Sequence, residues 1–165
     1  GLWVATEILM ATTPKLQAKL VAKFLRIAQK LFELRNYATC AQILSGVSNR
    51  AIQRLKRMHK QLDWKTAERY EQLNDNFDPV SGYSNYRNKL DHSAPSIPFI
   101  AVSLRTLTLI EEGNPKFLGD DLEVISFARM VMYTECIAGL RLGESDMIDY
   151  KFEPIPEIQN HLQNV

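Results

Sequence analysis

The sequence has few cysteines, no long apolar run and almost no net charge, and each of these absences excludes a class of protein. Only two of its 165 residues are cysteines, Cys40 and Cys136, and their spacing fits neither a metal motif nor a disulfide framework. No apolar run approaches the roughly 20 residues that a membrane-spanning helix needs. Because the formal net charge is +1, the chain as a whole has no strong attraction to nucleic acid or to a membrane surface. We expect buried, reduced thiols in one cytosolic domain.

Motifs for covalent chemistry and for phosphate binding are absent too. The histidines His59, His92 and His161 lie far apart and form no HExxH pair, so surface or capping roles are expected for them. The chain has no GxxxxGK[ST] loop, no GxGxxG turn and no GxSxG elbow. Ser45 and Gly46 lie inside a helical pattern, which is more typical of close helix packing than of a nucleophile. The sequence therefore predicts no enzyme of the covalent kind, no cofactor and no metal site.

The sequence does contain strong helical periodicity. Apolar residues spaced by three and four predict a helix over residues 14–35, with Thr13 as its N-cap and Pro14 at the favoured first position. Its opposite side carries five cations, and such a stripe is usually a solvated face. These cations are Lys15, Lys19, Lys23, Arg26 and Lys30.

Weaker patterns predict the other helices. They cover residues 3–10, 37–47, 51–59, 64–73, 83–90 and 154–165. Asp63 could cap the helix over 64–73, and the turn-forming residues 74–82 predict a loop. No strand-like alternation persists anywhere, so the expected fold class is all-α.

The most informative segment is residues 95–115, PSIPFIAVSLRTLTLIEEGNP, which begins like a helix and ends on two carboxylates. Glu111 and Glu112 fall in its last turn, at the negative end of the helix dipole, where each costs roughly 0.3–1 kcal/mol. Gly113 is expected in the left-handed conformation just past the helix, and Pro115 prevents its continuation. Both acids could be solvated or paired with an arginine, and the alternative is a functional site.

A second helix is predicted to follow this segment, from about residue 121 to 140, with Asp120 and Glu123 forming a start like a capping box. Within residues 128–133 Arg129 is the only charge, so this helix is apolar on more than one side. The two helices would form an antiparallel hairpin over about residues 98–140, joined by a short loop. One apolar side would contact the body of the domain, and another is left for a partner.

Four segments in order resemble one family. They are WVATEIL (3–9), RNYATCAQILSGVSNRAIQRLK (35–56), NYRNKL (85–90) and the segment at 95–115. They resemble the catalytic domain of guanine-nucleotide exchange factors for Ras-like small GTPases. The resemblance covers the later, larger part of that domain. It implies that residues 1–165 form a single domain with an irregular all-α fold and a protruding antiparallel hairpin. The N-terminal part of the family's domain would lie outside this chain.

In that family the hairpin enters between the two switch regions of the GTPase and disturbs the magnesium and phosphate site, and the nucleotide leaves without any covalent step. The resemblance implies a Ras- or Rap-like GTPase as the partner, with the nucleotide-free form preferred, since tighter binding of that form weakens nucleotide binding by the same factor. Glu112 matches the carboxylate that competes with phosphate and Mg²⁺, and Glu111 is the bystander. Thr108 matches the side chain that intrudes near the metal.

Further positions match GTPase contacts in the family. They are Leu109 and Asn114 on the inserted element, and Leu44, Val47, Ser48, Arg50, Gln53 and Tyr83 elsewhere. Ser48 stands where the family usually has asparagine. For Leu44, Val47 and Tyr83, packing in the core or at its rim is an equally good interpretation.

Two other functions are also consistent with the sequence. A non-catalytic, exchange-factor-like scaffold that binds partner proteins is favoured by the lack of the family's opening helices and disfavoured by the retained EEGNP sequence. A generic helical interaction module would explain the amphipathic pattern but not the four ordered segments. The expected location is cytoplasmic, with any membrane recruitment through regions outside this chain.

Overall fold

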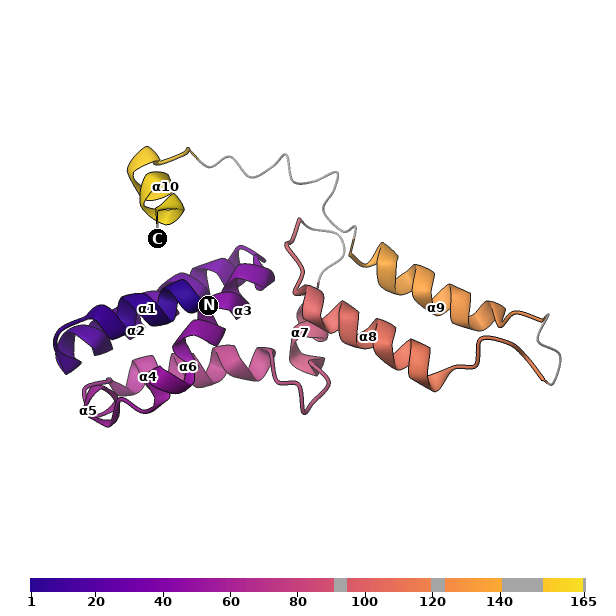
Figure 1. The fold of residues 1–165 in the computed structure, drawn as a ribbon, viewed down its shortest axis with the longest axis horizontal. Helices are drawn as coiled ribbons and strands as arrows, with labels where there is room; N and C mark the ends of the chain where they lie inside the picture. Colours follow the sequence, from indigo (N-terminus) through magenta and orange to yellow (C-terminus); the bar gives the residue numbers. More distant parts are fainter. Residues whose placement is uncertain (91–94, 120–123, 141–152, 165) are drawn as a thin grey trace.

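The computed structural model describes residues 1–90, 95–119, 124–140 and 153–164, most of which are helical. The helices, labelled in Figure 1, are α1 (Leu2–Met10), α2 (Pro14–Glu33), α3 (Tyr37–Val47), α4 (Arg50–Gln53), α5 (Lys56–His59), α6 (Trp64–Asn76), α7 (Ser84–Lys89), α8 (Ile100–Gly113), α9 (Phe127–Ala138) and α10 (Pro156–Gln163). Within the described ranges, β structure is limited to two isolated bridges. The predicted all-α fold is confirmed.

Helix α2 lies at the centre of the body of the fold, by which we mean α1–α6. Its buried residues recur at spacings of three and four, as the sequence predicts, and they pack against α1, α3, α5 and α6. Burying each large apolar side chain contributes about 1.5–3 kcal/mol. The hydroxyl of Thr13 accepts a hydrogen bond from the Leu16 N–H at 3.2 Å, and Pro14 opens the helix. The predicted N-cap is therefore confirmed, and so is the amphipathic packing of this helix.

Helices α1 and α3 approach each other closely at Gly46. A Cβ at this position would lie 2.5 Å from the carbonyl oxygen of Gly1 and 2.6 Å from the Cβ of Val4, so only glycine fits. This confirms the packing role expected for the Ser45–Gly46 pair. Cys40 of α3 is completely buried, and burial raises the pKa of its thiol to about 12, which keeps the thiol protonated.

Several boundaries differ from the sequence predictions. The helix expected over 51–59 is broken into α4 and α5, because Leu55 leaves the helical conformation (φ −78°, ψ 67°) and packs against the core. Asp63 caps α6 as predicted, accepting the Thr66 N–H at 2.6 Å. Hydrogen bonds from the backbone and the side chain of Thr66 lower the pKa of the Asp63 carboxyl. Helix α6 then runs past residue 73 to Asn76, whose side chain donates to the Gln72 carbonyl at 2.6 Å.

A second cluster of aromatic side chains joins the body to the hairpin. Tyr37, Tyr86 and Val102 form its buried centre. Three ring pairs meet there edge to face, and the pair of Phe77 and Tyr86 is stacked. Beside it, the N–H of Tyr37 donates to the carbonyl of Ile97 at 3.0 Å, and the N–H of Ile97 donates to the carbonyl of Arg35 at 2.9 Å. From this cluster α8 and α9 project away from α1–α6 (Figure 1). None of the described helices is long and apolar enough to cross a bilayer.

Candidate functional site

The protruding part of the fold is the antiparallel pair of α8 and α9. The two helices pack along each other, as predicted, but α9 begins at Phe127 and not near residue 121. The connection is therefore longer than the expected short loop. Its two sides are tied by an antiparallel bridge, in which the Leu118 N–H donates to Val124 at 2.8 Å and the Ser126 N–H donates to Lys116 at 3.0 Å. The proposed capping pair at 120 and 123 lies outside the described residues.

The end of α8 also differs from the sequence prediction. Gly113 is the last helical residue rather than a left-handed residue after the helix, and the described glycines with positive φ are Gly82 and Gly119. The backbone instead becomes extended at Asn114, the residue after the helix (φ −131°, ψ 128°). The Asn114 amide donates to the Ile110 carbonyl at 3.2 Å, so it satisfies one of the carbonyls left open at the helix end.

Glu111 is held across the hairpin by α9. Its carboxylate accepts hydrogen bonds from the Arg129 guanidinium and the Tyr133 hydroxyl. The Arg129 side chain is 7% exposed, donates to the Asn114 carbonyl at 3.2 Å and donates to Tyr133 at 3.2 Å. The hydrogen bond from Arg129, followed by that from Tyr133, lowers the pKa of Glu111. Glu111 therefore has a structural partner and fixes the end of α8 to α9.

Glu112 differs from its neighbour in its partners, although both side chains are exposed. It is exposed, and it forms no side-chain hydrogen bond or ion pair with any residue that the structure describes. Thr108, one turn earlier, is exposed too, and its hydroxyl donates to the Leu104 carbonyl at 3.1 Å. Leu104 and Leu109 are 54% and 55% exposed. Helix α8 thus presents one uncommitted carboxylate among exposed apolar side chains.

The angle at which α8 leaves the body is fixed by hydrogen bonds at its base. The Tyr86 hydroxyl accepts the Phe99 N–H at 2.9 Å, and Arg87 donates to the Thr106 hydroxyl at 2.8 Å. Arg105 donates to a carbonyl of the 77–83 loop at 2.8 Å. Its guanidinium also lies 5.7 Å from the centre of the Tyr83 ring. These contacts anchor the hairpin through its first helix.

Tyr83 occupies a strained position at this junction. Its φ of 61° lies in the left-handed region, which costs a bulky residue about 1–3 kcal/mol. Its half-buried ring meets Phe99 edge to face at 6.1 Å. The structure places Tyr83 at the root of the hairpin and at the rim of the aromatic cluster.

The remaining predicted contact residues lie on the body, apart from the hairpin. Leu44 and Val47 are each 3% exposed and belong to the core, so core packing is their role in this structure. Ser48 is exposed and shares a hydrogen bond of 2.9 Å with the Tyr70 hydroxyl. Gln53 donates to the Val47 carbonyl at 3.4 Å, and Arg50 is exposed at the start of α4. The predicted site residues therefore form two groups, with Tyr83 at the junction.

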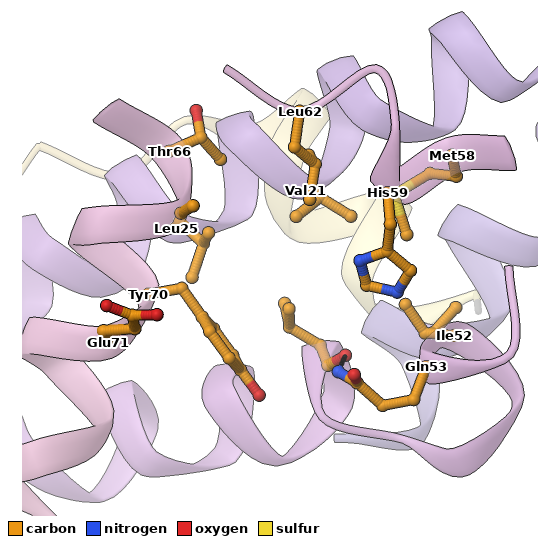
Figure 2. A pocket seen from close by; sticks show the side chains of 12 residues that line it. Val21, Leu25, Ile52, Gln53, Met58, His59, Leu62, Thr66, Tyr70 and Glu71 are labelled. Carbon is orange, nitrogen blue, oxygen red and sulfur yellow. Dashed lines mark hydrogen bonds between the residues drawn. The ribbon is translucent and has the colours of Figure 1, made fainter. Parts of the chain in front are cut away.

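A cavity of about 170 Å³ adjoins the body group. Figure 2 shows His59 and Tyr70 on opposite sides of it, with the His59 ring above Gln53. Its walls come from α2, α3, α4, α5, α6 and the α5–α6 connection. His59 is half-buried rather than a surface residue, and its Nε2 atom is buried with no partner among the described residues. His161 is exposed, as expected, and His92 lies outside the described residues.

Sequence reasoning missed the residues that hold the hairpin. Arg129 was noticed only as the single charge in an apolar stretch, which is itself the signal that it needs a partner when buried. Nothing in the local sequence marks Tyr86 or Tyr133 as hydrogen-bonding partners of distant residues. Among the described residues, no group of three or more His, Cys, Asp or Glu side chains is arranged to hold a metal ion.

The chain matches the RasGEF domain model over residues 1–131. It is 35% identical to Ras guanine nucleotide exchange factor K of Dictyostelium discoideum, covering the whole chain and 10% of that relative. It is 33% identical to Rap guanine nucleotide exchange factor 3 of Mus musculus, covering 82% of the chain and 14% of that relative. This chain spans only 10% to 28% of the length of the Dictyostelium discoideum exchange factors K, A and Q, which it matches over nearly all of its own length. With the family model matching most of its length, this chain belongs to the RasGEF domain family.

Proposed function

We propose that this chain is the later part of a guanine-nucleotide exchange domain that promotes GDP release from a Ras- or Rap-like small GTPase. The family membership supports this proposal, as do relatives named as exchange factors for Ras and for Rap. The observation that carries it is the difference between the two adjacent glutamates. Glu111 is bound to Arg129, whereas Glu112, on the same protruding helix, has no side-chain partner among the described residues.

The proposed mechanism is displacement without covalent chemistry. The α8–α9 hairpin would enter between the two switch regions of the GTPase. The Glu112 carboxylate would then lie where phosphate and Mg²⁺ bind, repelling the phosphate and competing for the cation. Thr108 would intrude beside it. By thermodynamic linkage, preference for the nucleotide-free GTPase weakens nucleotide binding by the same factor.

The body would supply the second part of the interface. Ser48, Arg50 and Gln53 are the exposed members of that group and would contact the second switch region. Leu109 and Asn114 would contact the GTPase from the hairpin, and Tyr83 from its root. Leu44 and Val47 would act only from beneath, by supporting α3.

Release of fluorescent GDP from a panel of Ras and Rap GTPases tests this proposal. We expect the chain to accelerate release from at least one member and to bind that member most tightly when it is nucleotide-free. The alternative function, a non-catalytic scaffold, gives a different result, namely GTPase binding with no acceleration at any concentration. If the chain neither binds any member of the panel nor accelerates release from it, both functions are contradicted.

A further inference from the structure

The charges of this chain are divided unequally along its length. The first 65 residues carry 12 Lys or Arg and 3 Asp or Glu, whereas the other 100 residues carry 8 and 16. The overall charge of +1 therefore conceals a basic half and an acidic half. Charge asymmetry of this kind is typical of proteins that bind an anionic surface.

Much of the basic charge lies on one side of α2. Successive residues of a helix are about 100° apart, so the five cations of α2 occupy a stripe only about 80° wide and about 22 Å long. All five are exposed. The buried residues of α2 lie on the opposite side of the helix. We call these cations the basic stripe, and its members are Lys15, Lys19, Lys23, Arg26 and Lys30.

Few acidic side chains neutralise the basic stripe. Lys30 pairs with Glu33 at 2.6 Å, and the other four cations form no ion pair with any described residue. Asp63 lines a groove beside Lys15 and Lys19, but its carboxylate is engaged in capping α6. The stripe therefore presents a net positive potential to a large partner.

One edge of the stripe is apolar. Leu16 and Ile27 follow Lys15 and Arg26 directly and are 44% and 38% exposed. No aromatic side chain is among the exposed residues of α2, so base stacking, which supports much single-strand binding, has no platform here. A row of cations beside exposed aliphatic side chains fits the boundary between lipid headgroups and acyl chains.

We propose that the basic stripe of α2 is a docking surface for anionic phospholipid headgroups at a membrane. The five cations lie against the headgroups, and Leu16 and Ile27 enter the upper acyl region. The α8–α9 hairpin projects from the body away from α2 (Figure 1), so docking leaves it accessible. This surface belongs to the chain itself and does not depend on the proposed exchange activity.

Sedimentation with vesicles tests this inference. The whole chain is mixed with phosphatidylcholine vesicles that do or do not contain phosphatidylserine, at about 0.15 M salt. We expect binding only to the vesicles with phosphatidylserine. The double variant Lys19→Glu/Lys23→Glu should bind them at least roughly 30-fold more weakly, since each cation near such a surface contributes about a factor of five.

A variant of equal net charge provides the control. Arg54→Glu/Lys116→Glu changes two exposed cations outside α2 and should keep most of the binding. Equal losses in both variants, or no binding by the unaltered chain, would overturn the proposal. Circular dichroism verifies folding, and Lys19→Gln/Lys23→Gln serves if the glutamate variant does not fold.

Two further measurements test the contribution of the apolar edge and distinguish a lipid surface from nucleic acid as the partner. Leu16→Gln/Ile27→Gln keeps every charge and should weaken vesicle binding severalfold. A fluorescent single-stranded RNA is titrated in parallel. Tight RNA binding that persists in this variant, together with no vesicle binding, would assign the stripe to nucleic acid and contradict a lipid surface.

Discussion

Glu111 and Arg129, 18 residues apart in the chain, meet across the hairpin, while Glu112 next to Glu111 has no partner among the described residues. The ion pair is asymmetric, because the Arg129 side chain is 7% exposed and the Glu111 side chain is 65% exposed. Arg129 also holds the Asn114 carbonyl, just past the end of α8. The pair therefore fixes the turn of helix that carries Glu112.

Replacing Arg129 should loosen that turn. In Arg129→Gln we expect faster hydrogen exchange at the amides of residues 112–118, and slower GDP release from the GTPase although Glu112 is intact. Arg129→Lys should restore only part of the effect, because an ammonium cannot reproduce the planar donor fork of arginine. The matched control is Lys116→Gln, which removes an exposed cation from the connection between α8 and α9. Hydrogen exchange in Arg129→Gln identical to that of the parent chain would contradict this role.

Acid should release the same contact. Because hydrogen bonds from Arg129 and Tyr133 lower the pKa of Glu111 in the folded chain, the contact stabilises the hairpin above the ordinary glutamate pKa of about 4.3. Its contribution is lost as the pH falls through the lowered pKa. Hydrogen exchange of the hairpin, corrected for its intrinsic pH dependence, should be constant from pH 5 to 8 and should accelerate in stronger acid. Glu111→Gln should abolish this acid step, and a step that persists in that variant would assign it to another group.

Gly46 should be intolerant of any side chain. In Gly46→Ala the new methyl group meets the Gly1 carbonyl and Val4, so α1 and α3 must separate. Overpacking of this kind costs about 1–3 kcal/mol, and thermal unfolding should begin several degrees lower. Gly113→Ala, where a Cβ meets nothing within 4 Å, should be neutral or slightly stabilising. Equal unfolding temperatures for Gly46→Ala and the parent would contradict the close approach.

Tyr86 should matter through its hydroxyl. Tyr86→Phe keeps the buried ring but leaves the Phe99 N–H without the acceptor it has at 2.9 Å. A fully buried donor left unsatisfied costs about 1–3 kcal/mol, and because this donor is part-buried we expect a loss at the lower end of that range, measured by urea unfolding. Tyr70→Phe removes an exposed hydroxyl bonded to Ser48 and should cost less than 1 kcal/mol, in line with a typical net hydrogen bond. A larger loss in Tyr70→Phe than in Tyr86→Phe would reverse this ranking.

Local sequence signals predicted much of the fold. Thr13, Pro14 and the apolar spacing specified α2, because a cap and a periodic face act within one element. The break at Leu55 was missed, since it depends on that side chain packing against a core assembled from distant segments. Gly113 was expected to be left-handed, but it is the last helical residue, and the backbone becomes extended only at Asn114.

The candidate site could be predicted in its positions but not in its support. The order of four sequence segments placed Glu112 and Thr108 on a protruding helix. The resemblance alone distinguished Glu112 from Glu111. The physical difference, that Arg129 and Tyr133 bind Glu111, arises only when the hairpin closes. The cavity beside Gln53 and the burial of Leu44 and Val47 likewise arise from tertiary packing, which a single sequence does not specify.

The most direct test of the account is GDP release from the responsive GTPase in the presence of Glu112→Ala. Loss of an interface residue with a dominant role costs about 2 kcal/mol or more, so we predict release at least about 30-fold slower than with the parent chain, with unfolding temperature unchanged. If charge is what displaces phosphate, GDP release with Glu112→Gln should be nearly as slow. Glu135→Ala, which removes an exposed glutamate of α9, should accelerate release as the parent chain does. Release that is equally fast with Glu112→Ala at matched protein concentration would contradict the central claim.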